Sequence, residues 1–147
     1  MSNYPVWWDT TVTVFSKRTS PTSLVTWHKA TINNCFWKHQ GSKVNVGDVL
    51  IDTESIICRI PSQSNFIDSL EWMNKADEEV SGCFTLQQGD IIVRGICEDE
   101  INEYQSGKRS TDLISKYRQN KGCMEIKDVA INTMTGMVNP HYNVRGL

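Results

Sequence analysis

Short runs of β-branched and aromatic residues recur along this chain, and glycine, proline or asparagine interrupts them about every ten residues. Clear examples are TVTVF at 11–15 and the end of LIDTESIICRIP at 50–61. In the second run, Ile56, Cys58 and Ile60 fall on one face, as a half-buried strand requires. Seven or eight such short strands with one helix predict a mainly β fold, a small β-barrel or sandwich with long loops between strands.

Only one segment has a clear helical pattern. In residues 110–120, Ser110 is suited to cap a helix, and Leu113 and Tyr117 belong to its apolar stripe. We therefore expect this helix to lie on the β-structure. The segment 62–82 is more polar, and its few apolar residues fit either a loop or a short helix inserted between strands.

The length of 147 residues fits one barrel-like domain over residues 1–147, with residues 1–10 as an N-terminal arm. The formal net charge of −2 excludes a protein that attracts nucleic acid or an anionic membrane through its overall field. No run approaches the ~18 apolar residues of a membrane span, and the first residues lack the pattern of a secretory signal. We therefore expect a reducing cytoplasm as the place of synthesis.

The stretch FTLQQGDIIVRG at 84–95 contains the first candidate for chemistry, Asp90. Gly89 supplies the positive φ that a tight turn needs, and an aspartate at the end of a turn accepts hydrogen bonds from nearby backbone N–H groups. Its neighbours lack the further oxygen ligands of a calcium loop. Asp90 is therefore predicted to shape a hairpin turn.

The other candidates for chemistry are weaker. The acidic stretch CEDEINE at 97–103 is interpreted as a solvated strand edge. SGKRST at 106–111 lacks the first glycine of a phosphate-binding loop, so only Lys108 and Arg109 remain, as a candidate contact for an acidic partner or nucleic-acid phosphate. Five cysteines without C-x-x-C spacing and three isolated histidines form no motif. We expect no catalytic, cofactor-binding or metal-binding residue, and no enzyme.

The five tryptophans are more informative. Trp7 and Trp8 are adjacent, so in extended chain they cannot both face one core, and large rings outside a core are typical interface anchors. Trp72 fits either a core or an interface, whereas Trp27 and Trp37 are expected in the barrel core. The candidate interface residues are Trp7, Trp8, Trp72, Lys108 and Arg109.

Several short sequence motifs occur in a characteristic order along residues 10–147. They are TVTVFSK and VTWHKATINNCFW, then QGDIIVRGICEDEI, DLISKY, MEIKDVAIN and HYNVRG. Together they resemble the small head–tail connector proteins of tailed bacteriophages, in particular the head-closure (stopper) or adaptor-like family. The segment 62–82 departs from that pattern, because stopper proteins are often shorter.

The resemblance implies a structural virion protein that forms a homo-oligomeric ring of about six or twelve copies. Such a ring lies in the virion neck, between a portal-side adaptor and the tail, and closes the DNA-filled head. It is made in the cytoplasm of the host bacterium, and no cofactor comes with the family. The excursions at 38–49, which is expected to be a hairpin, and at 62–82 would clasp neighbours or face the channel, with packaged DNA as a candidate contact.

In a ring, different patches of one subunit meet, so we expect acidic residues 98–103 of one subunit to face Lys108 and Arg109 of the next. A tail terminator or tail-completion protein is an alternative that shares the barrel and the ring. A small cytoplasmic hydrolase with a Cys–His or carboxylate pair is the alternative of another class.

Overall fold

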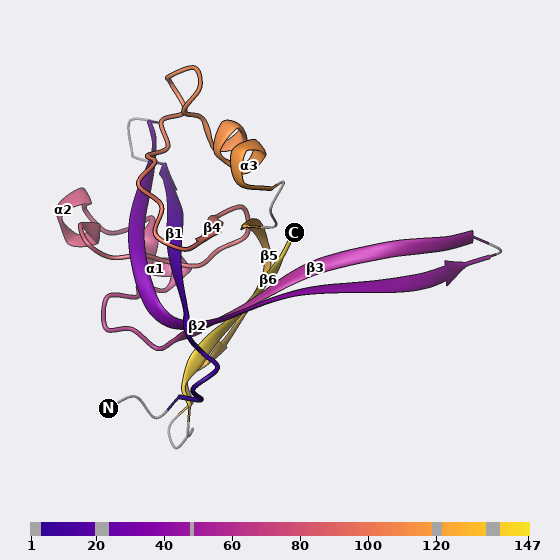
Figure 1. Cartoon of the computed structure of the whole chain (residues 1–147). Coiled ribbons are helices and arrows are strands. Elements are labelled where there is room, and N and C mark those ends of the chain that lie inside the picture. The colour runs from indigo at the N-terminus through magenta and orange to yellow at the C-terminus, as the bar shows by residue number, and fades with distance from the viewer. Residues whose placement is uncertain (1–3, 20–23, 48, 119–121, 135–138) are drawn as a thin grey trace.

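The computed structural model describes residues 4–19, 24–47, 49–118, 122–134 and 139–147. Their strands are β1 (Thr10–Thr19), β2 (Val25–Val46), β3 (Val49–Pro61), β4 (Ile91–Arg94), β5 (Cys123–Asn132) and β6 (His141–Gly146). These strands close into an antiparallel barrel in the order β1-β2-β3-β6-β5-β4 (Figure 1). The predicted mainly β fold is confirmed, and it is a barrel.

The described strands are six rather than seven or eight, for two reasons. The sequence indicates a break at Asn33 and Asn34, whereas β2 continues through this point. Asn34 has a φ of 60°, and the strand bends there from pairing with β1 to pairing with β3. The sequence of residues 83–97 predicts a strand, a turn and a second strand, but before β4 the described backbone forms only an isolated bridge between Phe84 and Phe66.

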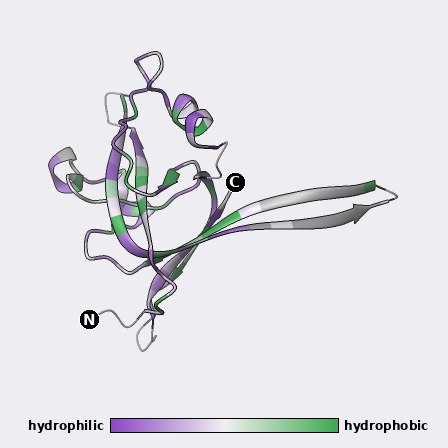
Figure 2. Cartoon of the chain, viewed as in Figure 1, coloured by the Kyte–Doolittle hydropathy of each residue, from purple (hydrophilic) through white to green (hydrophobic). Residues whose placement is uncertain are grey.

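Strand β1 is buried on both faces because two apolar clusters flank it. Val12 and Val14 belong to the cluster that fills the barrel, together with residues from β2, β3, β5 and β6. Phe15 belongs to a second cluster, which includes Leu113 of helix α3 (Ser110–Arg118). Figure 2 shows apolar residues on the strands of the barrel and more polar ones on the connections. The helix therefore lies on the barrel, as predicted.

The start of α3 is stabilised differently from the prediction. The backbone N–H of Ser110 donates to Glu103 Oε1 at 2.8 Å, and the N–H of Arg109 donates to Asp112 Oδ2 at 3.1 Å. Two carboxylates thus take the capping role that the sequence assigned to the Ser110 hydroxyl. The predicted helix end, at 119–120, lies outside the described residues.

The segment 62–82 contains two short helices, α1 (Ser69–Trp72) and α2 (Asp77–Val80), and it packs on the barrel. Trp72 is fully buried in a small cluster with Ile67 and Val80. Its indole N–H donates to the Lys17 carbonyl at 3.0 Å, and Arg18 Nη1 donates to the Trp72 carbonyl at 2.8 Å. This insertion is therefore fastened to β1.

The barrel closes where β5 crosses β6. In the sequence, the apolar alternation changes phase between Ile126 and Val129, which predicts a bulge or an irregular crossing. The register between the two strands does shift, between Ile126 and Asp128. A Cβ atom at Gly146 would lie too close to the Glu125 carbonyl oxygen, so only glycine fits this crossing. None of the helices in the described ranges is long and apolar enough to span a bilayer.

Candidate interaction surfaces

Residues 40–55 of β2 and β3 form a hairpin arm that projects from the barrel (Figure 1). Seven residue pairs, ending with Val46 opposite Val49, continue the ladder there. Strand β6 pairs with β3 only from Ile56 onward, and β1 pairs with β2 only up to Cys35. Both outer edges of the hairpin arm are therefore unpaired within the described part of the chain. At about 3.4 Å per residue, the arm is roughly 24 Å long.

The ladder of the hairpin arm continues to its tip. The backbone register pairs Val44 with Ile51 and Val46 with Val49. Val49 is 62% exposed.

The N-terminal segment packs on one end of the barrel. Trp8 is buried, stacks on Tyr4 with ring centroids 5.3 Å apart, and meets the edge of the His141 ring at 5.5 Å. The Tyr4 hydroxyl donates to the Pro140 carbonyl. The expected N-terminal arm is therefore held against the barrel from Tyr4 onward.

Trp7 lies on the opposite side of the same segment and is 64% exposed. This confirms that the adjacent tryptophans do not share one core. Val6 is exposed too, as are Ile131 and Met134 at the end of β5. Ile131 pairs with Tyr142, whereas Trp8 meets the ring of the preceding residue, His141, on the other face of β6.

The other tryptophans are used inside the subunit. Trp8 and Trp72 are buried in the chain's own core, so neither ring is available to a neighbour in this conformation. Trp27 and Trp37 are half-buried and pack at the margins of the two main clusters rather than within them. Of the tryptophans proposed as interface anchors, Trp7 is the exposed one, and its role in an interface stays a prediction.

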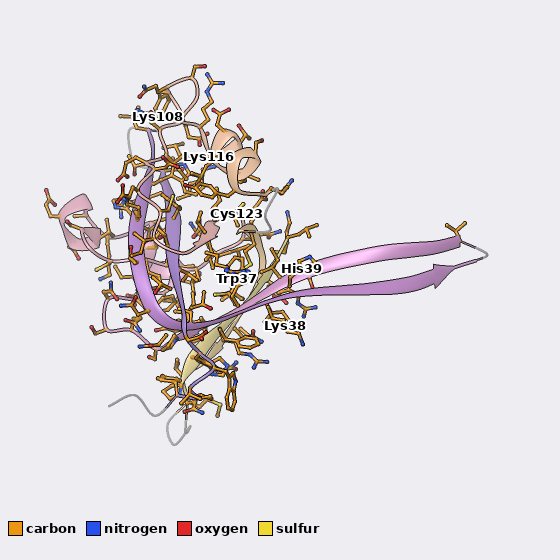
Figure 3. All side chains as sticks on the ribbon, in the orientation of Figure 1. Trp37, Lys38, His39, Lys108, Lys116 and Cys123 are labelled. Carbon is orange, nitrogen blue, oxygen red and sulfur yellow. The ribbon has the colours of Figure 1, made fainter. Side chains whose placement is uncertain are left out.

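Lys108 and Arg109 are exposed in the turn before α3, beside a hollow of about 260 Å³. Acidic residues line its other side. Figure 3 shows Lys108 and Lys116 on the α3 side of the molecule, away from Lys38 at the base of the hairpin arm. Asp99 accepts hydrogen bonds from Lys116 Nζ and the Tyr117 hydroxyl, both at 2.7 Å. The bond from Lys116, followed by that from Tyr117, lowers the pKa of Asp99.

The acidic stretch is thus paired within its own subunit. Besides Asp99, Glu100 lies 2.7 Å from Lys29 Nζ, and Glu103 accepts the bond from the α3 backbone described above. The stretch is also not a strand edge, because β4 ends at Arg94. Three of the acids that were expected to face the next subunit therefore have local partners, and the interface role of Lys108 and Arg109 stays a prediction.

Asp90 does shape a turn, although the turn contacts β1 instead of joining two strands of a hairpin. Its backbone N–H donates to the Gln87 carbonyl at 3.1 Å, and Gly89 has a φ of 94°. Oδ1 accepts from the Lys17 N–H at 3.0 Å and from Gln87 Nε2 at 3.3 Å. Oδ2 is buried without a partner among the described residues. Burial raises the pKa of this carboxyl to about 7.

The cysteines are placed mainly as small apolar side chains. Cys35, Cys58, Cys97 and Cys123 are buried, and Cys83 is half-buried. Burial and the neighbouring Cys35 thiol raise the pKa of Cys58, and burial raises that of Cys123. These two thiols are therefore poor nucleophiles near neutral pH. Among the residues that the structure describes, no three His, Cys, Asp or Glu side chains are grouped to hold a metal ion.

The exposure of Ile131 and Met134 at the end of β5 was not recognised in the sequence, because neither residue lies in a pattern that predicts it.

Comparison with known proteins identifies one family. A model described as a family of unknown function (DUF6751) matches residues 7–147. Among curated proteins and solved structures, no match to the chain is found.

Proposed function

We propose that this chain, which belongs to the family of unknown function DUF6751, is a structural subunit of a tailed-phage virion. In this proposal it forms a ring in the head–tail connector, closes the DNA-filled head and joins the head to the tail. The ring contains about six or twelve copies and contacts a portal-side adaptor and tail proteins.

The hairpin arm is the observation that carries this proposal. A two-stranded ribbon that leaves its parent sheet is marginally stable in water, and its unpaired edges invite pairing with other chains. An arm of roughly 24 Å therefore suits a subunit whose arm is covered by another molecule in an assembly. An isolated monomer gains little from such an element.

The barrel supplies the second requirement of a ring subunit, a rigid body. Its interior is filled by apolar side chains, including Val12, Ile60 and Ile126, which are fully buried. Close-packed interiors resist deformation, so elements attached to the barrel keep fixed directions. The hairpin arm and the described N-terminal segment leave the barrel in different directions (Figure 1). Contacts between such unlike surfaces of identical subunits can close into a ring.

Deleting the gene from its phage and examining the particles tests the proposal. The expected result is tailless particles whose heads have lost their DNA, and restoration of infectious particles by the gene supplied in trans. Immunogold labelling of complete virions is expected at the neck. Filled heads beside overlong tails would instead assign the protein to tail termination, and normal virions would contradict any connector role.

A further inference from the structure

We propose that the outer face of the sheet formed by β2, β3, β6 and β5 binds the phosphate backbone of double-stranded DNA. The contacts come from Lys38, Arg59 and Arg145, which we call the basic patch. The surface follows from the register of the strands. The inference rests on the proposed function only for the source of the DNA, which is the packaged genome.

The backbone register brings the three residues of the basic patch together. Paired residues in an antiparallel ladder share a face, and so do residues two positions apart on one strand. Lys38 pairs with Ile57, and Ile57 pairs with Arg145, so Lys38 and Arg145 lie in one row, two strands apart. Arg59 lies in the next row, two residues from Ile57. The three backbone positions are therefore roughly 8–10 Å from one another.

The basic patch points away from the barrel interior. Cys58 and Val144, which precede Arg59 and Arg145 in the chain, are fully buried in the cluster that fills the barrel. Successive residues of a strand point to opposite faces, so the basic residues lie on the outside. Arg145 and Lys38 are exposed, and Arg59 is half-buried. All three can thus be reached from solvent on one side of the molecule.

The positive charges of the basic patch are largely uncompensated. Within the described ranges, the side chains of Lys38 and Arg59 make no ion pair or hydrogen bond. The Arg59 guanidinium lies 5.2 Å from the centre of the Phe36 ring, a contact that orients the group and leaves its charge in place. Arg145 lies 4.0 Å from Asp128, but both side chains are largely exposed, so this ion pair is weak.

A polyanion fits this arrangement better than a single anion. Since the three positions are spread over a sheet, their side chains cover a surface instead of converging on one phosphate. Each DNA strand carries a phosphate about every 3.4 Å along the duplex, so one duplex offers several phosphates to such a surface. Arginine and lysine bind these groups without reading the base sequence. A protein that holds whichever part of a genome reaches it needs contacts of this kind.

The composition of the surface favours nucleic acid over an acidic protein. Interfaces between proteins are depleted of charged residues at their centre, whereas interfaces with DNA are more polar and much more positively charged. Between Lys38 and Arg145 the apolar residue is Ile57, which is half-buried. The centre of this surface is therefore charged.

Fluorescence anisotropy with a labelled DNA duplex tests the proposal. The patch variant is Lys38→Gln with Arg145→Gln. The matched variant, Lys108→Gln with Arg109→Gln, removes the same charges from the exposed turn before α3, on another side of the molecule (Figure 3). This second pair is the phosphate contact that the sequence suggests, so the two variants compare rival surfaces. Lys38→Arg with Arg145→Lys keeps the charges of the patch.

Wild-type protein is expected to bind the duplex with a Kd on the order of 10⁻⁵ M in about 50 mM salt. Three phosphate contacts predict that the logarithm of the association constant falls with the logarithm of the salt concentration with a slope of about −2.7. The patch variant should raise the Kd by ~10-fold or more and make the slope shallower by about 2. The matched and charge-keeping variants should stay within about 3-fold of wild type.

Two single variants keep the test valid if the double variant does not fold. Lys38→Gln leaves the ion pair of Arg145 with Asp128 in place and should make the slope shallower by about 1. Asp128→Asn removes the negative charge beside Arg145 and should lower the Kd, because repulsion of the phosphates is lost. A Kd that these two changes leave at the wild-type value would overturn the proposal.

Other outcomes would also overturn it. One is wild-type protein that does not bind the duplex at about 1 mM. Another is a matched variant that loses as much binding as the patch variant, which would move the contact to the turn before α3. A polyglutamate peptide that binds the patch with a lower Kd than the duplex would assign the surface to an acidic protein.

The measurements in solution and the deletion of the gene test different proposals. Duplex binding that depends on Lys38 and Arg145, together with normal virions after deletion, would support the basic patch and overturn the connector role. Tailless particles without DNA after deletion, together with wild-type protein that does not bind the duplex, would overturn the patch and leave the connector role standing.

Discussion

The barrel and the hairpin arm share two strands, but the strands differ in the two regions in how many hydrogen-bonded neighbours they have. In the barrel, each strand has a neighbour on both sides and one face turned to a filled interior. In the arm, β2 and β3 have only each other. Within the described residues, β2 and β3 therefore have neighbours on both sides in the barrel and only each other over residues 40–55. This difference separates the residues that stabilise the fold from those available for assembly.

Among substitutions in or against the barrel, we expect the largest loss of stability from replacing Trp72. Trp72→Ala would leave a cavity in a fully buried cluster and remove the bond to the Lys17 carbonyl. We expect the free energy of unfolding, measured with urea, to fall by about 3–5 kcal/mol. Trp7→Ala is the matched control, because its exposed ring should change that free energy by no more than about 0.5 kcal/mol. Similar losses in both variants would contradict the assignment of the two rings.

The pH dependence of the free energy of unfolding tests the burial of the Asp90 carboxyl in its turn. Burial raises the pKa of Asp90 from 3.8 to about 7. Between these values the unfolded chain has released the proton and the folded chain retains it, so stability falls as pH rises, by at most about 1.4 kcal/mol per pH unit. Below pH 3.8 the contribution of the neutral carboxyl is complete, and above about pH 7 it is lost.

Asp90→Asn should remove this fall while keeping an oxygen to accept the Lys17 N–H. Urea denaturation of both proteins from pH 4 to pH 8 measures the difference. Asp99→Asn is the control: the pKa of Asp99 is lowered from 3.8, so its small contribution is lost only below that pH, and the variant should keep the fall in stability between pH 4 and pH 8. A wild-type protein whose stability follows that of Asp90→Asn at every pH would contradict the burial argument.

Glycines in the two regions should respond differently to alanine. Gly146→Ala places a Cβ against the Glu125 carbonyl where the barrel closes, and we expect a loss of about 1–3 kcal/mol in the free energy of unfolding. Gly41 in the hairpin arm has no atom within 4 Å of such a Cβ, so Gly41→Ala should be neutral or stabilising by up to about 1 kcal/mol. Equal losses would mean that the arm is as tightly packed as the barrel.

The smallest expected effect comes from shortening the hairpin arm. Replacing residues 42–53 by Asn-Gly would close the ladder at Gly41 and Glu54 with a two-residue turn. Since the strands of the arm pair only with each other there, we expect a change below about 0.5 kcal/mol in the free energy of unfolding. Denaturation with urea measures it, and hydrogen exchange should show unchanged protection in β1. A loss above about 2 kcal/mol would contradict the independence of barrel and arm.

Much of the barrel was predictable because its information is local. The alternation of Ile56, Cys58 and Ile60, the stripe of α3 and the bulge in β5 each lie within a few residues. The count of strands failed where a local signal was overridden. Asn34 does mark a change of direction, but hydrogen bonding to β1 before it and to β3 after it keeps β2 continuous.

The interaction surfaces were harder to predict, because they depend on contacts between distant segments. Trp72 lies among polar residues in the sequence and is buried only because Arg18 and Lys17 bind its segment to β1. The acids at 98–103 seemed free for a neighbour, but Lys29 and Lys116 come from other elements to pair with them. The divergence of Trp7 and Trp8 was predictable, because adjacent residues on an extended chain face opposite sides. The sequence did not indicate which of the two is exposed, and the interface role of Trp7 stays a prediction.

The continuity of β2 has a mechanical consequence. One continuous strand is part of the barrel wall and also one of the two strands of the hairpin arm. Force applied at the far tip is therefore carried along the backbone into the wall itself, past the bend at Asn34, without crossing a flexible tether. A molecule bound to the tip of the hairpin arm is therefore connected directly to the barrel wall, and a change in the orientation of the arm is transmitted to the barrel.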